Sequence, residues 1–375
     1  MTWPALEHDL TGLGSTIERL ARARAAAAAP PHPATDRLQA LDGFGSNPGA
    51  LRARTYIPAG LPDMAPLVVV LHGCTQTAAG YDHGSGWSQL ADARGFALLF
   101  PEQQRANNPN LCFNWFSPAD ARRDAGEAHS IRQMIAAMIA AHSIDPHRIY
   151  VTGLSAGGAM ASIMLASYPE VFAGGAVIAG LPYGAANAMG DAFARMRGQG
   201  YPSDARLGAL VEGASAHEGP WPTLSVWQGS ADTTVDPSNA QRILGQWRAV
   251  HGVGDAPSQE DVVDGHVHQI WRDATGRAVI EYYDIGGMAH GTPLQAQGTG
   301  GVGTAGPHML EAGISSTRHI ARFWGLDEAG SADIPRPAGT ANARHSPAAA
   351  PAARAMPADV GTIIADSLRA AGLLR

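Results

Sequence analysis

The feature that most limits the fold of this chain is the alternation of short, uniformly apolar runs with stretches of helical periodicity. Apolar runs cover residues 66–71, 96–100 and 148–154, and the helical stretches that follow them cover 87–94, 120–142 and 156–168. Strands that are apolar on both faces are typical of parallel sheets covered by helices on both sides. We therefore expect an α/β fold with a mostly parallel central sheet.

The same alternation continues to about residue 327. A half-buried strand at 51–57 precedes it, further strands are predicted at 174–179, 223–227, 267–271 and 279–285, and helices at 237–250 and 307–324. Residues 183–222 interrupt the pattern with Gly, Ala and Pro. We predict an irregular excursion near the functional site there.

Four segments are predicted along the chain. Residues 36–327 form the catalytic domain, and residues 1–35 form either a loosely held tail or a short helix. Residues 328–357 are rich in Ala and Pro, which is typical of a flexible linker. The apolar spacing in residues 358–375 predicts a C-terminal amphipathic helix.

Charge and hydropathy exclude two classes of partner. The formal net charge is −7 and the 26 Lys and Arg form no dense basic block, which argues against nucleic acid. No run approaches the roughly 18 apolar residues that a membrane span needs. The first 30 residues show no apolar core of a secretion signal, so the sequence alone predicts a cytoplasmic protein. The oligomeric state is left open.

The segment Gly153-Leu154-Ser155-Ala156-Gly157 lies between a predicted strand and a predicted helix. A G-x-S-x-G sequence in this context forms a tight turn that presents the serine hydroxyl above the sheet. A side chain at either flanking glycine would collide with its neighbours. We therefore predict that Ser155 is a nucleophile.

A serine nucleophile needs a histidine base and a carboxylate that orients it, in the chain order Ser, acid, His for this fold. Asp232 follows an apolar strand, and His290 lies in a Gly-flanked loop after a late strand. The alternative acid, Asp236, precedes a proline and a helix and is interpreted as a cap. His308 and His319, in or near the last predicted helix, are interpreted as surface or packing residues. His266 and His268 have the spacing H-x-H without a nearby acid or thiol, and they are interpreted as a solvated strand end. No metal site and no organic cofactor are predicted.

The developing oxyanion needs preorganised donors. The backbone N–H groups of Cys74 and Ala156 are predicted to supply them, because Cys74 follows an early apolar strand where this fold has its oxyanion loop. A thiol nucleophile at Cys74 is the weaker alternative. Cys74 and Cys112 are the two cysteines, and they form either two buried thiols or one disulfide. The aromatic loop around Trp115 is either a packed anchor or an apolar wall for substrate.

Several separate stretches, in order, resemble the polyhydroxybutyrate depolymerase family of esterases, in its short-chain group. They are Leu71-His-Gly-Cys-Thr-Gln-Thr77, Pro101-Glu-Gln-Gln104, Cys112-Phe-Asn-Trp-Phe116, Gly153-Leu-Ser-Ala-Gly-Gly158 and the segments around Asp232 and His290. The resemblance covers roughly residues 50–325 and implies an α/β-hydrolase fold. It also implies a Ser155–Asp232–His290 triad and an oxyanion hole from Cys74 and Ala156.

The resemblance further implies a Cys74–Cys112 disulfide and a substrate role for Trp115, and we assign His72 to substrate binding with it. Members of the family are typically extracellular, which conflicts with the missing secretion signal. The chain shows no Thr-rich linker and no appended β domain that would bind solid polymer. Soluble oligomers, amorphous polymer or small esters are therefore the expected substrates.

The expected function is hydrolysis of polyhydroxybutyrate-type polyester, or of its hydroxyalkanoate oligomers, through an acyl-enzyme. The first alternative is a feruloyl or acetylxylan esterase, which shares the fold and the triad. A serine peptidase and a non-catalytic binding protein on the same scaffold are the others. The complete triad argues against the binding protein.

Overall fold

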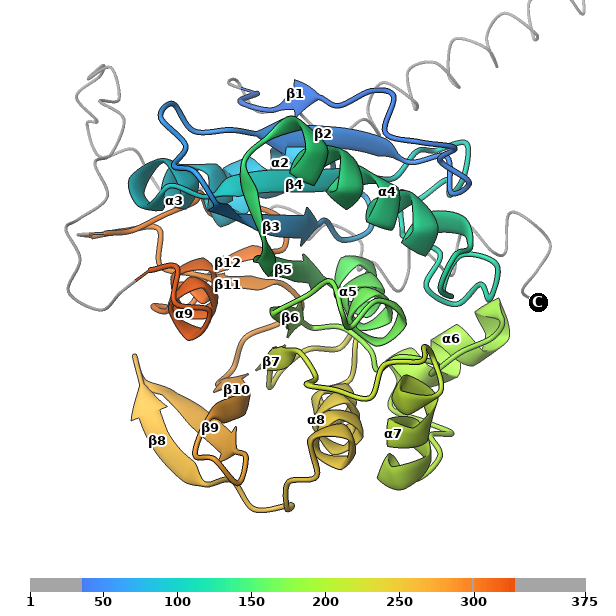
Figure 1. Ribbon diagram of the computed structural model, residues 1–375. Coiled ribbons are helices and arrows are strands. Elements are labelled where there is room, and N and C mark those ends of the chain that lie inside the picture. Colours follow the sequence, from blue (N-terminus) through green and yellow to red (C-terminus); the bar gives the residue numbers. More distant parts are fainter. Residues whose placement is uncertain (1–35, 299, 328–375) are drawn as a thin grey trace, which may run out of the picture.

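The computed structural model describes residues 36–298 and 300–327, which contain a ten-stranded sheet with helices on both sides (Figure 1). The strand order is β1-β2-β4-β3-β5-β6-β7-β10-β9-β8, and the six strands from β4 to β10 run parallel. Antiparallel strands extend the sheet at each end. The elements predicted in 1–35, 328–357 and 358–375 lie outside the described residues. The α/β-hydrolase architecture is confirmed.

The bounds of the elements, labelled as in Figure 1, are as follows. The strands are β1 Gln39–Ala40, β2 Arg52–Tyr56, β3 Ala65–Leu71, β4 Ala97–Glu102, β5 Ile144–Leu154, β6 Gly174–Ile178, β7 Thr223–Gly229, β8 Gln259–Val263, β9 His266–Arg272, β10 Ala278–Ile285, β11 Thr292–Leu294 and β12 Met309–Glu311. The helices are α2 Ala78–Ser85, α3 Trp87–Arg94, α4 Gly126–Ala141, α5 Ala156–Ser167, α6 Met189–Met196, α7 Asp204–Glu212, α8 Ser238–His251 and α9 Ser316–Phe323.

Both faces of the sheet are buried, as the uniformly apolar strands predict. Successive side chains of a strand point to opposite faces. Leu67 and Val69 of β3 accordingly belong to the core cluster on the side of α4, α5 and α8, whereas Val68 and Val70 belong to the cluster on the side of α2, α3 and α9. Figure 1 shows α4, α5 and α8 on one side of the strands and α3 and α9 on the other.

The central strands end in register, which brings the segments that follow them to one edge of the sheet. Gly153 of β5 pairs with Leu71 of β3, and its neighbour Leu154 pairs with Ile178 of β6. The row continues through β7 to Ile285 of β10. The residues after β3, β5, β7 and β10 therefore meet, although more than 200 positions of sequence separate them.

Two predicted elements differ from the structure. Residues 183–222 contain the helices α6 and α7, where we expected an irregular excursion. The helix predicted at 307–324 is shorter, because residues 309–311 form β12 and α9 starts only at Ser316. Gly313, with φ 75°, breaks the helical pattern before Ser315, whose hydroxyl caps α9.

The outermost described strand on one side is β8, whose residues are almost all exposed. It includes Glu260 and Asp261, and its Val262 pairs with Val267 of β9. In the part of the chain that the structure describes, no helix has the length and hydropathy of a membrane span.

Candidate active site

Ser155 lies in the turn between β5 and α5, with φ 57° and ψ −118°. A non-glycine residue in such a conformation costs roughly 1–3 kcal/mol, and it persists only where its surroundings enforce it. The amide of Ser155 donates to the Ile178 carbonyl, and its own carbonyl accepts the first helical bond, from Ala159. The serine is therefore fixed at the end of the strand and the start of the helix.

The glycines on either side of Ser155 permit this turn. A Cβ on Gly153 would lie 2.4 Å from the Gly157 carbonyl group, and one on Gly157 would lie 2.3 Å from the Leu71 carbonyl oxygen. Both distances are far below van der Waals contact with backbone atoms that cannot move aside. The expected collision at both glycine positions is therefore present in the structure.

Asp232 and His290 form a buried hydrogen-bonded pair. His290 Nδ1 lies 2.7 Å from Asp232 Oδ2, and the two residues are 8% and 4% exposed. The backbone amides of Thr234 and Val235 donate to the other oxygen, Oδ1, and the side-chain Nε2 of Gln228 donates to Oδ2. Four donors thus converge on one carboxylate, and they fix the oxygen that faces the imidazole. Sequence reasoning did not identify Gln228.

Ser155 and His290 line one small pocket. Its walls are Gly73, Cys74, Gln76, Leu154, Ser155, His290 and His308. Among the described residues, no group makes a hydrogen bond with the Ser155 hydroxyl. Catalytic hydrogen bonds are often absent without substrate and form in the bound complex, so the pocket is compatible with proton transfer.

The two predicted oxyanion donors belong to this site. Cys74 lines the pocket beside Ser155, and Ala156 is the first residue of α5. Within residues 36–298 and 300–327, neither amide donates a hydrogen bond to the protein. An N–H group in the first turn of a helix has no intrahelical partner, and the helix dipole favours negative charge there.

The loop that carries Cys74 is attached to the loop that follows β4 at three points. Cys74 and Cys112 form a disulfide, with their Cα atoms 4.2 Å apart. The Thr75 amide donates to the Asn110 carbonyl over 2.7 Å, and the Gln103 amide donates to His72 Nε2. A disulfide-bonded Cys74 has no free thiol, which removes the alternative thiol nucleophile.

His72 is a correction to the predicted substrate-binding residues. It is 1% exposed, and both ring nitrogens bond to backbone, Nδ1 to the Gly73 carbonyl and Nε2 to the Gln103 amide. This pattern requires a neutral imidazole, and burial lowers the pKa of His72. Its ring is therefore enclosed by protein and links the loop after β3 to the loop after β4.

Trp115 also differs from the substrate role that the resemblance implies. Its side chain is 8% exposed, packs edge-on against Phe116 and belongs to the hydrophobic core. It does not line the pocket at Ser155. The structure therefore favours the alternative of a packed loop anchor.

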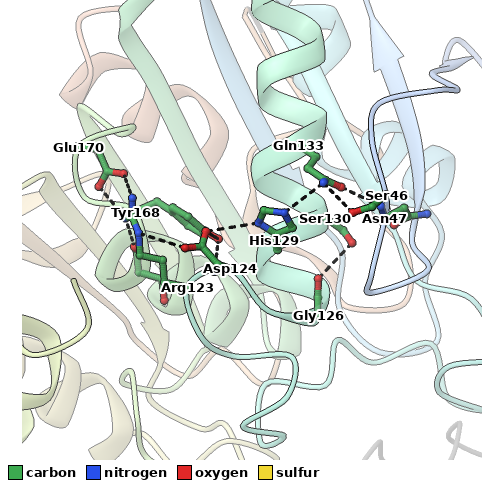
Figure 2. Close-up of polar contacts among 11 residues, drawn as sticks. Ser46, Asn47, Arg123, Asp124, Gly126, His129, Ser130, Gln133, Tyr168 and Glu170 are labelled. Carbon is green, nitrogen blue, oxygen red and sulfur yellow. Dashed lines mark hydrogen bonds and ion pairs between the residues drawn. The ribbon is translucent and has the colours of Figure 1, made fainter. Parts of the chain in front are cut away.

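Glu127, the second residue of α4, binds the aromatic loop around Trp115. Sequence reasoning did not identify this residue. Its carboxylate accepts hydrogen bonds from the Asn114 amide, the Asn114 side chain and the Gln103 side chain. Glu127 is 1% exposed, and burial raises its pKa to about 8 against the opposing effect of these donors. Just before Glu127, Figure 2 shows the polar contacts of Arg123 and Asp124, which lie toward the surface.

Two other histidines differ from their expected surface or packing places. His308 lines the pocket and donates from Nδ1 to the His290 carbonyl. His268, predicted at a solvated strand end, is 7% exposed between Asp261 and Glu281. Burial alone would lower the pKa of His268, but the two carboxylates raise it. In the described residues, no group of His, Cys, Asp and Glu side chains could bind a metal ion.

A serine at a strand-to-helix turn of an α/β-hydrolase sheet, beside a histidine bound to a buried aspartate, is typical of the serine ester hydrolases. The family described as "Esterase PHB depolymerase" matches residues 51–268. The chain belongs to this family, and it is a carboxylic ester hydrolase.

Individual relatives agree with that class. Poly(3-hydroxyalkanoate) depolymerase C of Paucimonas lemoignei is 47% identical, over 77% of this chain and 70% of that protein. An acetylxylan esterase of Coprinopsis cinerea is 30% identical, over 71% of this chain and 73% of that protein. Feruloyl esterase B of Talaromyces funiculosus is 27% identical, over 68% and 73%.

A solved structure, the acetyl xylan esterase from Aspergillus awamori, superposes with a TM-score of 0.66. The superposition covers 77% of this chain and 99% of that one, at 24% identity. At that identity the likeness supports the α/β-hydrolase fold and nothing finer.

Proposed function

We propose that this chain hydrolyses the ester bonds of polyhydroxybutyrate-type polyester, or of its hydroxyalkanoate oligomers, with Ser155 as nucleophile. The observation that carries the mechanism is the buried Asp232–His290 pair, whose histidine lines the same pocket as Ser155. The backbone amides of Cys74 and Ala156 beside Ser155 have no acceptor among the described residues. The substrate class is supported by the 47% identity to the Paucimonas lemoignei depolymerase.

In the first half-reaction, Ser155 Oγ attacks the ester carbonyl carbon while His290 Nε2 takes the hydroxyl proton. Asp232 accepts a hydrogen bond from the Nδ1–H group of His290 and stabilises the imidazolium that forms. The amides of Cys74 and Ala156 donate to the carbonyl oxygen as it gains negative charge. His290 then returns the proton to the leaving alcohol, and the acyl group stays on Ser155.

In the second half-reaction, water replaces the alcohol. His290 Nε2 removes one proton from the water, whose oxygen attacks the acyl carbon, and the same two amides stabilise the second oxyanion. The bond between the acyl carbon and Ser155 Oγ breaks, and Oγ regains its proton from His290. One ester and one water give one acid and one alcohol, without a metal or an organic cofactor.

The second candidate function is hydrolysis of acetylxylan or feruloyl esters. It is favoured by relatives that are 30% and 27% identical and bear those names. The depolymerase relative is far more similar, and for this reason we place the hydroxyalkanoate ester first. A serine peptidase and a non-catalytic binding protein have no comparable support.

The test measures hydrolysis of 3-hydroxybutyrate oligomers, acetylated xylan, methyl ferulate and p-nitrophenyl butyrate by the purified protein. We expect oligomer cleavage to exceed cleavage of the two plant-wall esters, and Ser155→Ala to abolish all four activities. A Ser155→Ala variant with a tenth of wild-type turnover would refute the nucleophile. Faster cleavage of acetylated xylan or ferulate than of oligomers would refute the proposed substrate but keep the mechanism.

A further inference from the structure

A short two-stranded ribbon begins directly beside the proposed base. Strand β11 starts at Thr292, two residues after His290, and pairs in parallel with β12, which starts at Met309. The Thr292 amide donates to the His308 carbonyl over 2.8 Å, and this bond begins the ribbon. The pairing fixes His308 beside the residues that follow His290, although 18 positions separate the two histidines.

His308 contacts His290 in two ways. Its Nδ1 lies 3.2 Å from the His290 carbonyl oxygen and donates to it. The two imidazole rings lie nearly perpendicular, at 75°, with their centroids 5.9 Å apart. Both residues line the pocket that contains Ser155.

The backbone around this contact is crowded and strained, which indicates that the local structure enforces it. His308 has φ 60°, a conformation that few side chains other than Asn, Asp and His adopt readily. A Cβ on Gly291 would lie 2.8 Å from the His308 carbonyl oxygen, so glycine is needed beside the base. The two segments approach as closely as their backbones allow.

The loop that carries His290 is attached to the segment after β7 at positions before the histidine. The Gly287 amide donates to the Ser230 hydroxyl over 2.8 Å, and the Met288 carbonyl accepts from the Ala231 amide. The His290 side chain is bound by Asp232. The bond from His308 to the His290 carbonyl fixes the main chain of the base itself.

We propose that His308 is a positioning residue for His290, which fixes the backbone of the base through its Nδ1–H and completes the wall of the pocket with its ring. The inference rests on the proposed role of His290 as general base. His308 acts through His290 and takes no proton from the substrate. Its loss should therefore lower kcat and leave KM nearly unchanged.

Three substitutions separate the hydrogen bond from the backbone strain. Asn and Asp tolerate a positive φ as His does, and in Asn the Nδ2 atom can occupy the place of the imidazole Nδ1. His308→Asn therefore keeps the donor, whereas His308→Asp points an acceptor at the His290 carbonyl. His308→Gly relieves the strain and has no side chain, so it folds without the donor.

The measurements are kcat and KM for p-nitrophenyl butyrate from pH 5 to 9, the rate of labelling by a fluorophosphonate, and the melting temperature. We expect His308→Asn to keep kcat within about threefold, and His308→Gly and His308→Asp to lose about tenfold or more, because small misplacements of catalytic groups are costly. The Asp carboxylate should also move the acidic limb of the kcat profile to higher pH, since it stabilises a protonated His290.

Equal turnover in the Asn, Asp and Gly variants would overturn the proposal, as would a change confined to KM, which indicates substrate contact. A loss in the Gly variant that follows a lower melting temperature, with no rescue by Asn, would also overturn it. The simple ester keeps this test separate from the substrate assignment. Failure of the proposed mechanism would appear instead as unlabelled wild-type protein or an active Ser155→Ala variant.

Discussion

At the scale of single residues, the site depends on backbone conformations that most side chains avoid. Ser155 and His308 both have φ near 60°, and they line the same pocket. Strained residues of this kind persist where the surrounding structure determines their conformation, and they cluster at functional sites. The proposed function of Ser155 as nucleophile and the stability of the chain are therefore opposed at this position.

Comparison of Ser155→Ala with Ser155→Gly measures that opposition. Both variants should lose at least about 10³-fold in kcat, because neither has a nucleophile. Only glycine relieves the positive φ, so Ser155→Gly should unfold at a temperature a few degrees above Ser155→Ala, for a strain of roughly 1 kcal/mol. Equal melting temperatures would mean that the turn stores no strain at the serine.

A second residue-scale prediction concerns the pH dependence of stability at Glu127. The pKa of this carboxyl rises from 4.5 to about 8 in the folded protein, so the folded chain binds its proton more tightly than the unfolded chain. The stability that it contributes is complete below pH 4.5 and is lost as the pH rises through about 8.

Glu127→Gln removes this titration and keeps a similar shape. The melting temperature of the wild type, relative to that of Glu127→Gln, should therefore fall as the pH rises from 5 to about 8. The free energy of unfolding should drop by at most about 1.4 kcal/mol per pH unit over that range. Parallel melting curves over that range would contradict the raised pKa of Glu127.

At the scale of elements, sequence periodicity predicted the strands better than the connections. The runs at 66–71 and 148–154 lie within β3 and β5, because strands buried on both faces have no polar positions to obscure them. The exposed strand β8 has no apolar pattern and was not predicted. Helices α6 and α7 were missed because Gly, Ala and Pro around them are also typical of loops.

The disulfide is the element-scale feature with the clearest test. It closes a loop of 38 residues, for which the chain-entropy model gives about 4 kcal/mol of stabilisation. The double variant Cys74→Ala/Cys112→Ala should lose stability up to that amount. The kcat of this variant should also fall by a larger factor than its KM rises, because the backbone amide of Cys74 is the proposed oxyanion donor.

Two comparisons keep that result interpretable. Reduction of the wild type with a thiol should give the same direction of kinetic change as the double variant, since both break the covalent link. A variant with reduced stability and unchanged kcat would show that the hydrogen bonds at His72 and Thr75 position the oxyanion loop without the disulfide.

At the scale of the whole molecule, the last described residue joins helices that lie far apart in the sequence. The buried Asp327 carboxylate accepts from Arg94 of α3 over 2.6 Å and from Arg318 of α9 over 2.8 Å. Trp324 stacks on Trp87 and Tyr150 beside this cluster. Residues 324–327 are thereby fixed against the α3 face of the sheet.

Asp327→Asn should destabilise the protein by about 3 kcal/mol, because it leaves Arg94, Arg318 and Arg322 without their buried counter-charge. The matched control is Asp255→Asn. Its carboxylate pairs with Arg248 at a fully exposed position, so its loss should cost much less stability than the loss of Asp327. Equal losses measured by chemical denaturation would mean that the burial of Asp327 has no energetic consequence.

Contacts between segments distant in sequence explain which residues of the candidate site could be predicted from the sequence and which could not. Ser155 and His290 stand in short local patterns with their own glycines, so each segment is informative alone. The contacts of His72, Glu127 and His308 join segments distant in sequence, and only the assembled sheet brings them together. The site is therefore predictable at its reacting groups and much less so in the groups that support them.

The exposed strand β8 has a consequence for how the protein behaves in concentrated solution. An outer strand offers unpaired backbone groups to a neighbouring molecule, and charged side chains oppose such pairing. In β8 that charge comes from Glu260 and Asp261, next to the exposed Val262. Loss of that charge removes the repulsion, so self-association in concentrated solution is expected to begin at this edge of the sheet.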